Sequence, residues 1–190
     1  GSPMATDPVD GRVRGLALGV RDRWAGHREY PYVRAAGTWI SRHGSLPAGL
    51  GAEVEHGADL LAAATRQLDD GADLVKLYLD GPDAETSPFT VEEVRAVVDE
   101  AHRRGASVTA HSGMLPGARV GAEAGVDSFE HGFQLDEDIV DLMVAGGVAL
   151  VATLAVLESW RSFGRTTRIP RFTDRDGRER IAARREQAHE

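Results

Sequence analysis

Short apolar segments alternate with segments of helical period along most of this 190-residue chain, and this alternation limits the folds that it can adopt. The apolar segments occupy residues 73–79, 106–111, 126–131 and 148–154, and the helix-like segments occupy 60–70, 90–104, 116–124 and 136–146. Apolar strands that are separated by amphipathic helices are typical of a parallel sheet covered by helices. The sequence therefore predicts an α/β protein, in either a barrel or a doubly wound form.

Local signals mark the ends of several helices. Thr90 and Glu93 have the spacing of a capping box, Asp136 stands at an N-cap position, and Gly125 stands where a helix ends. The pattern is weaker at both ends of the chain. There we predict a short strand at residues 32–37, irregular structure at 155–173 and a helix at 174–190.

The chain contains 21 arginines and a single lysine, Lys76, which lies within the apolar segment 73–79. Burial of an uncompensated charge costs on the order of several kcal/mol, so this position is expected to need a primary amine. A buried amine can lose its proton, form a Schiff base or add carbon dioxide to become a carbamate that binds metal. The structural alternatives are a lysine that reaches solvent at a strand end, or a buried ion pair with Asp73 or Asp80.

Two histidines end the apolar segments that follow Lys76, namely His111 and His131. In parallel α/β proteins, ligands meet the carboxyl ends of the strands. Three consecutive strands are therefore expected to bring Lys76, His111 and His131 to one rim of the sheet. The other histidines are predicted to lie on the surface: His27, His43, His56, His102 and His189.

Composition narrows the class of partner. A net charge of −8 and a pI near 5.4 argue against nucleic acid or an anionic membrane, which leaves small molecules. The chain has no cysteine, so it has no thiolate ligand or nucleophile, as is common in cytoplasmic proteins, and we predict that location. Its longest apolar run, at residues 146–157, is shorter than the ~18–20 residues of a membrane span.

Five stretches follow one another in a specific order and spacing: residues 71–76, 101–105, 110–111, 123–132 and 147–154. Together they resemble the metal-dependent amidohydrolase superfamily, in the branch that contains imidazolonepropionase and the prolidase-like enzymes. The resemblance covers roughly residues 34–190. It implies a distorted (β/α)8 barrel of the TIM type.

The resemblance also implies roles for the strand-end residues. Lys76 would be carboxylated and bridge two divalent metals, as a rule zinc, and His111 and His131 would bind the second metal. Two such metals hold a hydroxide at neutral pH and polarise a carbonyl, so the implied activity is hydrolysis of amide bonds in dipeptides or other small amides. Tyr78 shares a strand face with Lys76 and is expected to contact the substrate.

The chain also departs from the family pattern. It has no His-x-His pair for the first strand and no aspartate of the eighth strand, and Gly113 stands where the family often has a second histidine. We therefore predict a partial barrel that lacks its first and last strands and holds one metal or none. Such a chain is expected to be inactive alone, and to associate with itself or with the missing barrel segments.

Domain organisation follows from these expectations. Residues 1–10 are predicted to be a tag scar and a flexible N-terminus, because Gly1, Ser2 and Pro3 precede Met4. Residues 11–190 are predicted to form one incomplete barrel domain, since 42% hydrophobic residues suffice for one core.

Two other functions stay open. One is a barrel-derived binding or assembly module without activity, which the missing ligands favour. The other is a Schiff-base lyase or aldolase that uses Lys76 as its nucleophile. Trapping of a carbonyl substrate on Lys76 by borohydride distinguishes the lyase from the hydrolase.

Overall fold

A computed structural model describes residues 16–46, 50–81, 83–163, 165–169 and 173–187 of the chain. The predicted tag scar and flexible N-terminus at residues 1–10 lie outside the described residues, as does His189. No helix in the described ranges has both the length and the apolar character that a membrane crossing requires.

A six-stranded parallel sheet forms the centre of the fold, with the strand order β2-β1-β3-β4-β5-β6. The strands are β1 (Ile40–Arg42), β2 (Ala52–Val54), β3 (Leu74–Tyr78), β4 (Ser107–Ser112), β5 (Ser128–His131) and β6 (Ala149–Val151). The helices are α1 (Leu16–Trp24), α2 (Gly57–Asp69), α3 (Val91–Arg103), α4 (Leu115–Ala124), α5 (Glu137–Gly146), α6 (Leu154–Phe163) and α8 (Arg175–Gln187). The predicted α/β class, with parallel strands that alternate with helices, is confirmed.

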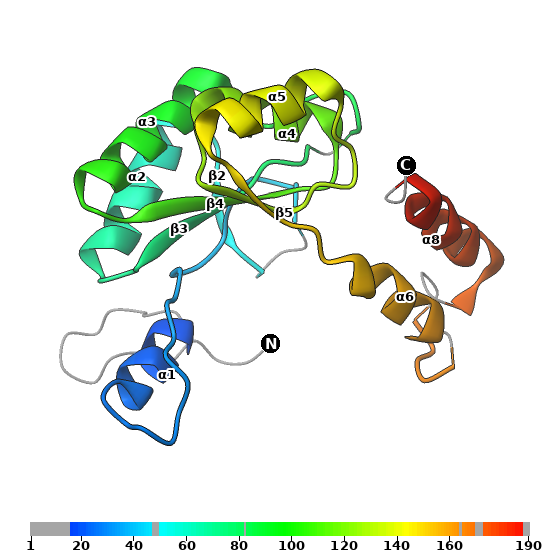
Figure 1. Ribbon diagram of the computed structural model, residues 1–190, viewed down its shortest axis with the longest axis horizontal. Coiled ribbons are helices and arrows are strands. Elements are labelled where there is room, and N and C mark those ends of the chain that lie inside the picture. The colour runs from blue at the N-terminus through cyan, green and yellow to red at the C-terminus, as the bar shows by residue number, and fades with distance from the viewer. Residues whose placement is uncertain (1–15, 47–49, 82, 164, 170–172, 188–190) are drawn as a thin grey trace.

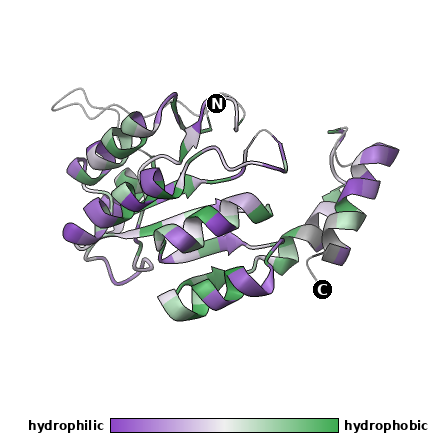
Figure 2. Ribbon diagram, turned by 90° about the horizontal axis from the view of Figure 1, so that it is seen from above, coloured by the Kyte–Doolittle hydropathy of each residue, from purple (hydrophilic) through white to green (hydrophobic). Residues whose placement is uncertain are grey.

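Helices α2, α3, α4 and α5 lie side by side on one face of the sheet, as Figure 1 shows. Helix α1 lies on the other side of the sheet. Helices α6 and α8 contact each other and lie apart from the other helices in both views, and α8 is largely hydrophilic (Figures 1 and 2). The helical layer therefore covers only one face of the sheet.

The capping signals in the sequence form as predicted. The Thr90 hydroxyl accepts a hydrogen bond from the Glu93 N–H at 3.3 Å, and the Glu93 carboxylate accepts one from the Thr90 N–H at 2.9 Å. Asp136 accepts a hydrogen bond from the Ile139 N–H at 2.8 Å at the start of α5. Gly125 ends α4 with a φ of 85°, a left-handed conformation that costs glycine little.

Two predictions at the ends of the chain are wrong. Residues 32–37 form no strand, because only Ala36 makes an isolated bridge, to Leu74, and the first strand of the sheet is β1 instead. Residues 154–163 form helix α6 rather than irregular structure, and an ion pair between Arg161 and Glu158 supports this helix across one turn. The predicted C-terminal helix is present as α8.

The core lies between the sheet and the helices α2 to α5. Val108 and Ala110 of β4 point into it and are fully buried, as are Val75 and Leu77 of β3 and Phe129 of β5. Alternate residues of a strand face opposite ways, so Thr109 and His111 of β4 lie on the other face, where they are half-buried. This second face, which carries the polar residues, holds the candidate site.

Candidate functional site

The three residues predicted to form a metal site lie on three neighbouring parallel strands. Lys76 lies within β3, His111 near the end of β4, and His131 at the end of β5. Tyr78 pairs with His111 across β3 and β4, and Ser112 pairs with His131 across β4 and β5. The parallel register therefore brings these strand ends to one rim, with Lys76 two residues deeper than Tyr78.

Lys76 is buried, with 3% of its side chain exposed, and it forms an ion pair with Glu130 of β5. Beyond this ion pair, no hydrogen-bond partner of its Nζ atom lies among the described residues. The Nζ atom also lies 5.6 Å from the centre of the Trp39 ring, within the range of a cation–π contact. Burial lowers the pKa of the Lys76 ammonium, although Glu130 opposes that shift.

The structural alternative of a Lys76 pair with Asp73 or Asp80 is wrong, because the partner is Glu130. Asp73 instead accepts one hydrogen bond from Arg21 and one from the Ala35 N–H, and Asp80 lies against His111. The reason is geometric: Lys76 of β3 and Glu130 of β5 lie on the same face of the sheet and meet across β4, whereas Asp73 precedes β3 at its other end.

His111 is held at its edge and on its face. Its Nε2 atom lies 3.1 Å from the Asp80 Oδ2 atom. Its ring stacks on Tyr78 with the ring centres 4.3 Å apart and an interplanar angle of 15°. The other ring nitrogen, Nδ1, is buried and has no hydrogen-bond partner in the described part of the chain. A ring nitrogen of this kind is suited to accept a metal or a proton.

His131 stands against the His111 ring, with the two ring centres 4.6 Å apart and a T-shaped arrangement. Its Nδ1 atom lies 2.6 Å from the Thr153 hydroxyl, so the Nε2 atom is on the opposite side of the ring. Burial lowers the pKa of His131, and the nearby His111 contributes further.

The backbone is strained where His131 meets Thr153. Both residues have positive φ, 81° for His131 and 46° for Thr153, at the carboxyl ends of β5 and β6. A β-branched residue such as threonine rarely adopts this region, and such strain is often found at functional sites.

Three residues of the site were missed as site residues by sequence reasoning: Asp80, Glu130 and Trp39. Asp80 continues the alternation of Lys76 and Tyr78 at intervals of two residues, and this periodicity was the available signal. Glu130 immediately precedes His131 in an otherwise apolar segment. Trp39 carried no signal, because its approach to Lys76 depends on the pairing of β1 with β3.

The donor set is suited to part of a metal centre. In the described ranges, no group of three or more His, Asp or Glu side chains is placed to hold a metal ion. His111 and His131 offer two adjacent imidazoles, which are ligands that zinc accepts readily.

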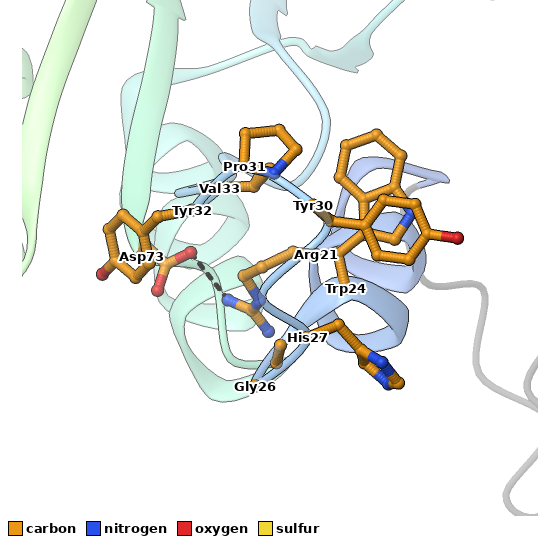
Figure 3. A pocket seen from close by; sticks show the side chains of 10 residues that line it. Arg21, Trp24, Gly26, His27, Tyr30, Pro31, Tyr32, Val33 and Asp73 are labelled. Carbon is orange, nitrogen blue, oxygen red and sulfur yellow. Dashed lines mark hydrogen bonds and ion pairs between the residues drawn. The ribbon is translucent and has the colours of Figure 1, made fainter.

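A separate pocket of about 310 Å³ lies at the opposite end of β3, where Arg21 and Asp73 form an ion pair at 2.8 Å (Figure 3). Stacked Trp24 and Tyr30 line its wall. It contains none of the predicted site residues. The titratable groups that gather on the other rim, rather than this cavity, therefore define the candidate site.

Comparison with known proteins agrees with the fold. No family model matches the chain. An uncharacterized protein of Mycobacterium tuberculosis is 36% identical over 141 residues, which are 70% of this chain and 37% of the relative. Ochratoxinase of Aspergillus niger is 30% identical over 112 residues, which are 55% of this chain and 23% of that enzyme.

Among solved structures, a Xaa-Pro dipeptidase with methionine bound in its active site superimposes with a TM-score of 0.72 at 28% identity. The match covers 91% of this chain and 47% of the dipeptidase. The chain thus spans about half of that solved structure and less than two-fifths of the curated relatives. The resemblance predicted from the sequence is confirmed, and the chain matches part of the TIM-type barrel of prolidase- and amidohydrolase-family proteins in the amidohydrolase superfamily.

Proposed function

We propose that the chain forms part of a metal-dependent hydrolase that cleaves amide bonds in dipeptides or other small molecules. The observation that carries this proposal is the gathering of a buried lysine and two contacting imidazoles on one rim of three parallel strands. Two of the similar proteins, the Xaa-Pro dipeptidase and ochratoxinase, support an amide substrate.

In this proposal, His111 and His131 hold a divalent cation, with zinc preferred. His111 contributes its buried Nδ1 atom, which has no partner within the described ranges, and His131 contributes the nitrogen that faces away from Thr153. When bound, the cation supplies a water activated at neutral pH and polarisation of the carbonyl that is attacked.

Lys76 supplies the remaining donor as a carbamate. The reaction joins the neutral amine to carbon dioxide with release of a proton, and the product is an anion with two oxygen donors. This conversion also removes a buried ammonium from the sheet. Tyr78 covers one face of His111 and would contact the substrate beside it.

The single lysine makes carbamate formation directly measurable. The chain is incubated with zinc and ¹³C-bicarbonate, and the carbamate carbon is observed by ¹³C NMR while bound zinc is measured by mass spectrometry. The wild-type chain should give a protein carbamate signal besides that of the terminal amine. Lys76→Arg should remove it and lower the zinc content, because guanidinium forms no carbamate.

His27→Gln is the matched control, because His27 is an exposed histidine on the far side of the molecule from the site. It should leave both signals unchanged. Equal zinc content in Lys76→Arg and wild type would make the lysine structural and refute the proposed ligand set.

The described sheet is open, with β2 and β6 as its edge strands. Unpaired strand edges associate with other chains, and Leu150 and Val151 of β6 are exposed. We therefore propose that this chain alone turns over a dipeptide poorly or not at all, and that it self-associates or binds the remaining barrel segments. Light scattering and a dipeptide panel with zinc and bicarbonate test this, and efficient turnover by a monomer would contradict it.

A carbonyl compound trapped on Lys76 by borohydride would replace the hydrolase with a Schiff-base lyase. A chain that assembles but binds neither zinc nor carbon dioxide would instead be a binding or assembly module.

A further inference from the structure

We propose that Asp80 is a positioning residue that keeps His111 protonated on Nε2 and presents its Nδ1 atom to the site. The inference rests on the proposed metal function only for the identity of the ligand that Nδ1 would take. The orientation of the ring itself follows from contacts within this chain.

Asp80 is almost fully buried, with 5% of the residue exposed, and both of its carboxylate oxygens accept hydrogen bonds. The backbone N–H of Gly113 lies 2.9 Å from Oδ2 and 3.1 Å from Oδ1, and that of Met114 lies 3.2 Å from Oδ1. The Ser112 hydroxyl lies 3.4 Å from Oδ1, but it donates its hydrogen to the closer Met114 carbonyl oxygen at 2.9 Å. With N–H groups directed at both oxygens, the carboxyl group acts purely as an acceptor, as an ionised carboxylate does.

An acceptor beside His111 determines the tautomer of the ring. The His111 Nε2 atom lies 3.1 Å from Oδ2, so it must carry the hydrogen that bonds to Asp80. In a neutral imidazole the other nitrogen then has a lone pair. That nitrogen, Nδ1, is the buried atom that has no partner in the described part of the chain.

The carboxylate is itself held rigidly. It sits before the first turn of α4, where the N-cap residue is Met114, and a negative charge is favourable at that end of a helix. Gly113 allows the close approach, because a Cβ atom there would lie 3.2 Å from Oδ2. Asp80 therefore connects the end of β3, the loop before α4 and the edge of the His111 ring, while Tyr78 fixes the face of the ring.

If Asp80 only anchored the loop, Asp80→Asn would leave the tautomer of His111 unchanged. The asparagine can keep its carbonyl oxygen on the Gly113 and Met114 N–H groups, and so preserve the anchor. Its amide N–H₂ then replaces Oδ2 and faces His111 as a donor. Under our proposal, the ring must therefore move its hydrogen from Nε2 to Nδ1.

Long-range ¹H–¹⁵N NMR of the histidine rings in the metal-free chain, near pH 8, reads this tautomer directly. The His111 signals are assigned by their loss in His111→Gln. Wild type should show the Nε2–H form, and Asp80→Asn the Nδ1–H form. Asp73→Asn is the control, because Asp73 is a carboxylate at the other end of β3 that is bound by Arg21, and it should leave the His111 tautomer unchanged.

An Nδ1–H tautomer in the wild-type chain would overturn the proposal. This measurement needs no variant, so it can be made even if Asp80→Asn does not fold. A folded Asp80→Asn chain that keeps the Nε2–H form would also overturn it.

Zinc titration tests separately whether Asp80 positions the His111 ring and whether His111 binds the metal. Asp80→Asn should weaken zinc binding about 10- to 100-fold, the usual effect of losing the partner of a metal-binding histidine, whereas Asp73→Asn should not change it. A tautomer switch with unchanged zinc affinity would uphold the positioning of His111 and refute the proposed metal ligand.

Discussion

The ion pair between Lys76 and Glu130 predicts that its two partners make unequal contributions to stability. Lys76 is 3% exposed, whereas the Glu130 side chain is 35% exposed and remains in contact with water. Lys76→Met keeps most of the apolar stem and leaves Glu130 hydrated. Glu130→Gln leaves a buried ammonium without its counter-ion. We therefore expect the glutamate variant to be much less stable than the lysine variant.

The expected loss of stability in Glu130→Gln follows from the burial of the Lys76 ammonium. Removing one partner of a buried pair costs about 3–5 kcal/mol when the other charge stays buried. The cost has an upper limit, because the lysine can release its proton. For an ordinary lysine at pH 7.4 this release costs about 4 kcal/mol, at about 1.36 kcal/mol for each of roughly three pH units. Access of water to Glu130 reduces the effect, so we expect Glu130→Gln to destabilise the chain by about 2–4 kcal/mol.

Replacement of the ammonium by an apolar group removes the cost of burying it, so Lys76→Met should be neutral or stabilising by about 1 kcal/mol or more. Urea unfolding followed by circular dichroism measures both changes. With a slope of about 2 kcal/mol per molar urea, Glu130→Gln should lower the midpoint by about 1–2 M.

The control is Glu123→Gln, which alters an exposed glutamate of α4 and should shift the free energy of unfolding by no more than about 0.5 kcal/mol. If Lys76→Met destabilises the chain more than Glu130→Gln does, the lysine is there for stability. The argument that this position needs an amine for chemistry would then be refuted.

Two further predictions concern packing and pH. Gly117→Ala should destabilise the chain by about 1–3 kcal/mol, because a Cβ atom there would lie 2.5 Å from the Leu79 carbonyl oxygen, whereas Gly19→Ala in α1 meets no atom within 4 Å and should stabilise it by about 0.5–1 kcal/mol. Thermal unfolding measures both, and equal effects would contradict this packing of α4 on the end of β3. Asp73→Asn should cost about 1–2 kcal/mol at pH 7. Burial alone would raise the pKa of Asp73, but the hydrogen bonds from Arg21 and the Ala35 N–H and the positive charges of Arg21 and Arg34 together outweigh burial, so the pKa is lowered. The stabilisation by Asp73 is therefore full above about pH 4 and is lost as the pH falls below that value, so urea unfolding of the two proteins should converge in acid; a constant difference down to pH 2 would contradict this.

Much of the fold could be predicted from the sequence because it is encoded in near neighbours. Helical and strand periods repeat within a few residues, and the Thr90 and Glu93 capping box spans a single turn. The same local patterns place His111 and His131 near the ends of their strands. Helix α6 was missed because an apolar run carries no clear period, so strand and helix cannot be told apart by it.

The partners of these residues were decided by the tertiary structure alone. Glu130 meets Lys76 because β4 lies between their strands in a fixed register, and Asp80 reaches His111 from 31 residues away. Such contacts depend on strand order and on how far each strand slides against its neighbour, which local periodicity does not specify. The sequence by itself determined the parallel α/β class and which side chains could carry chemistry, whereas only the packed sheet decided which counter-ion faces the lysine and which ring nitrogen of His111 meets Asp80.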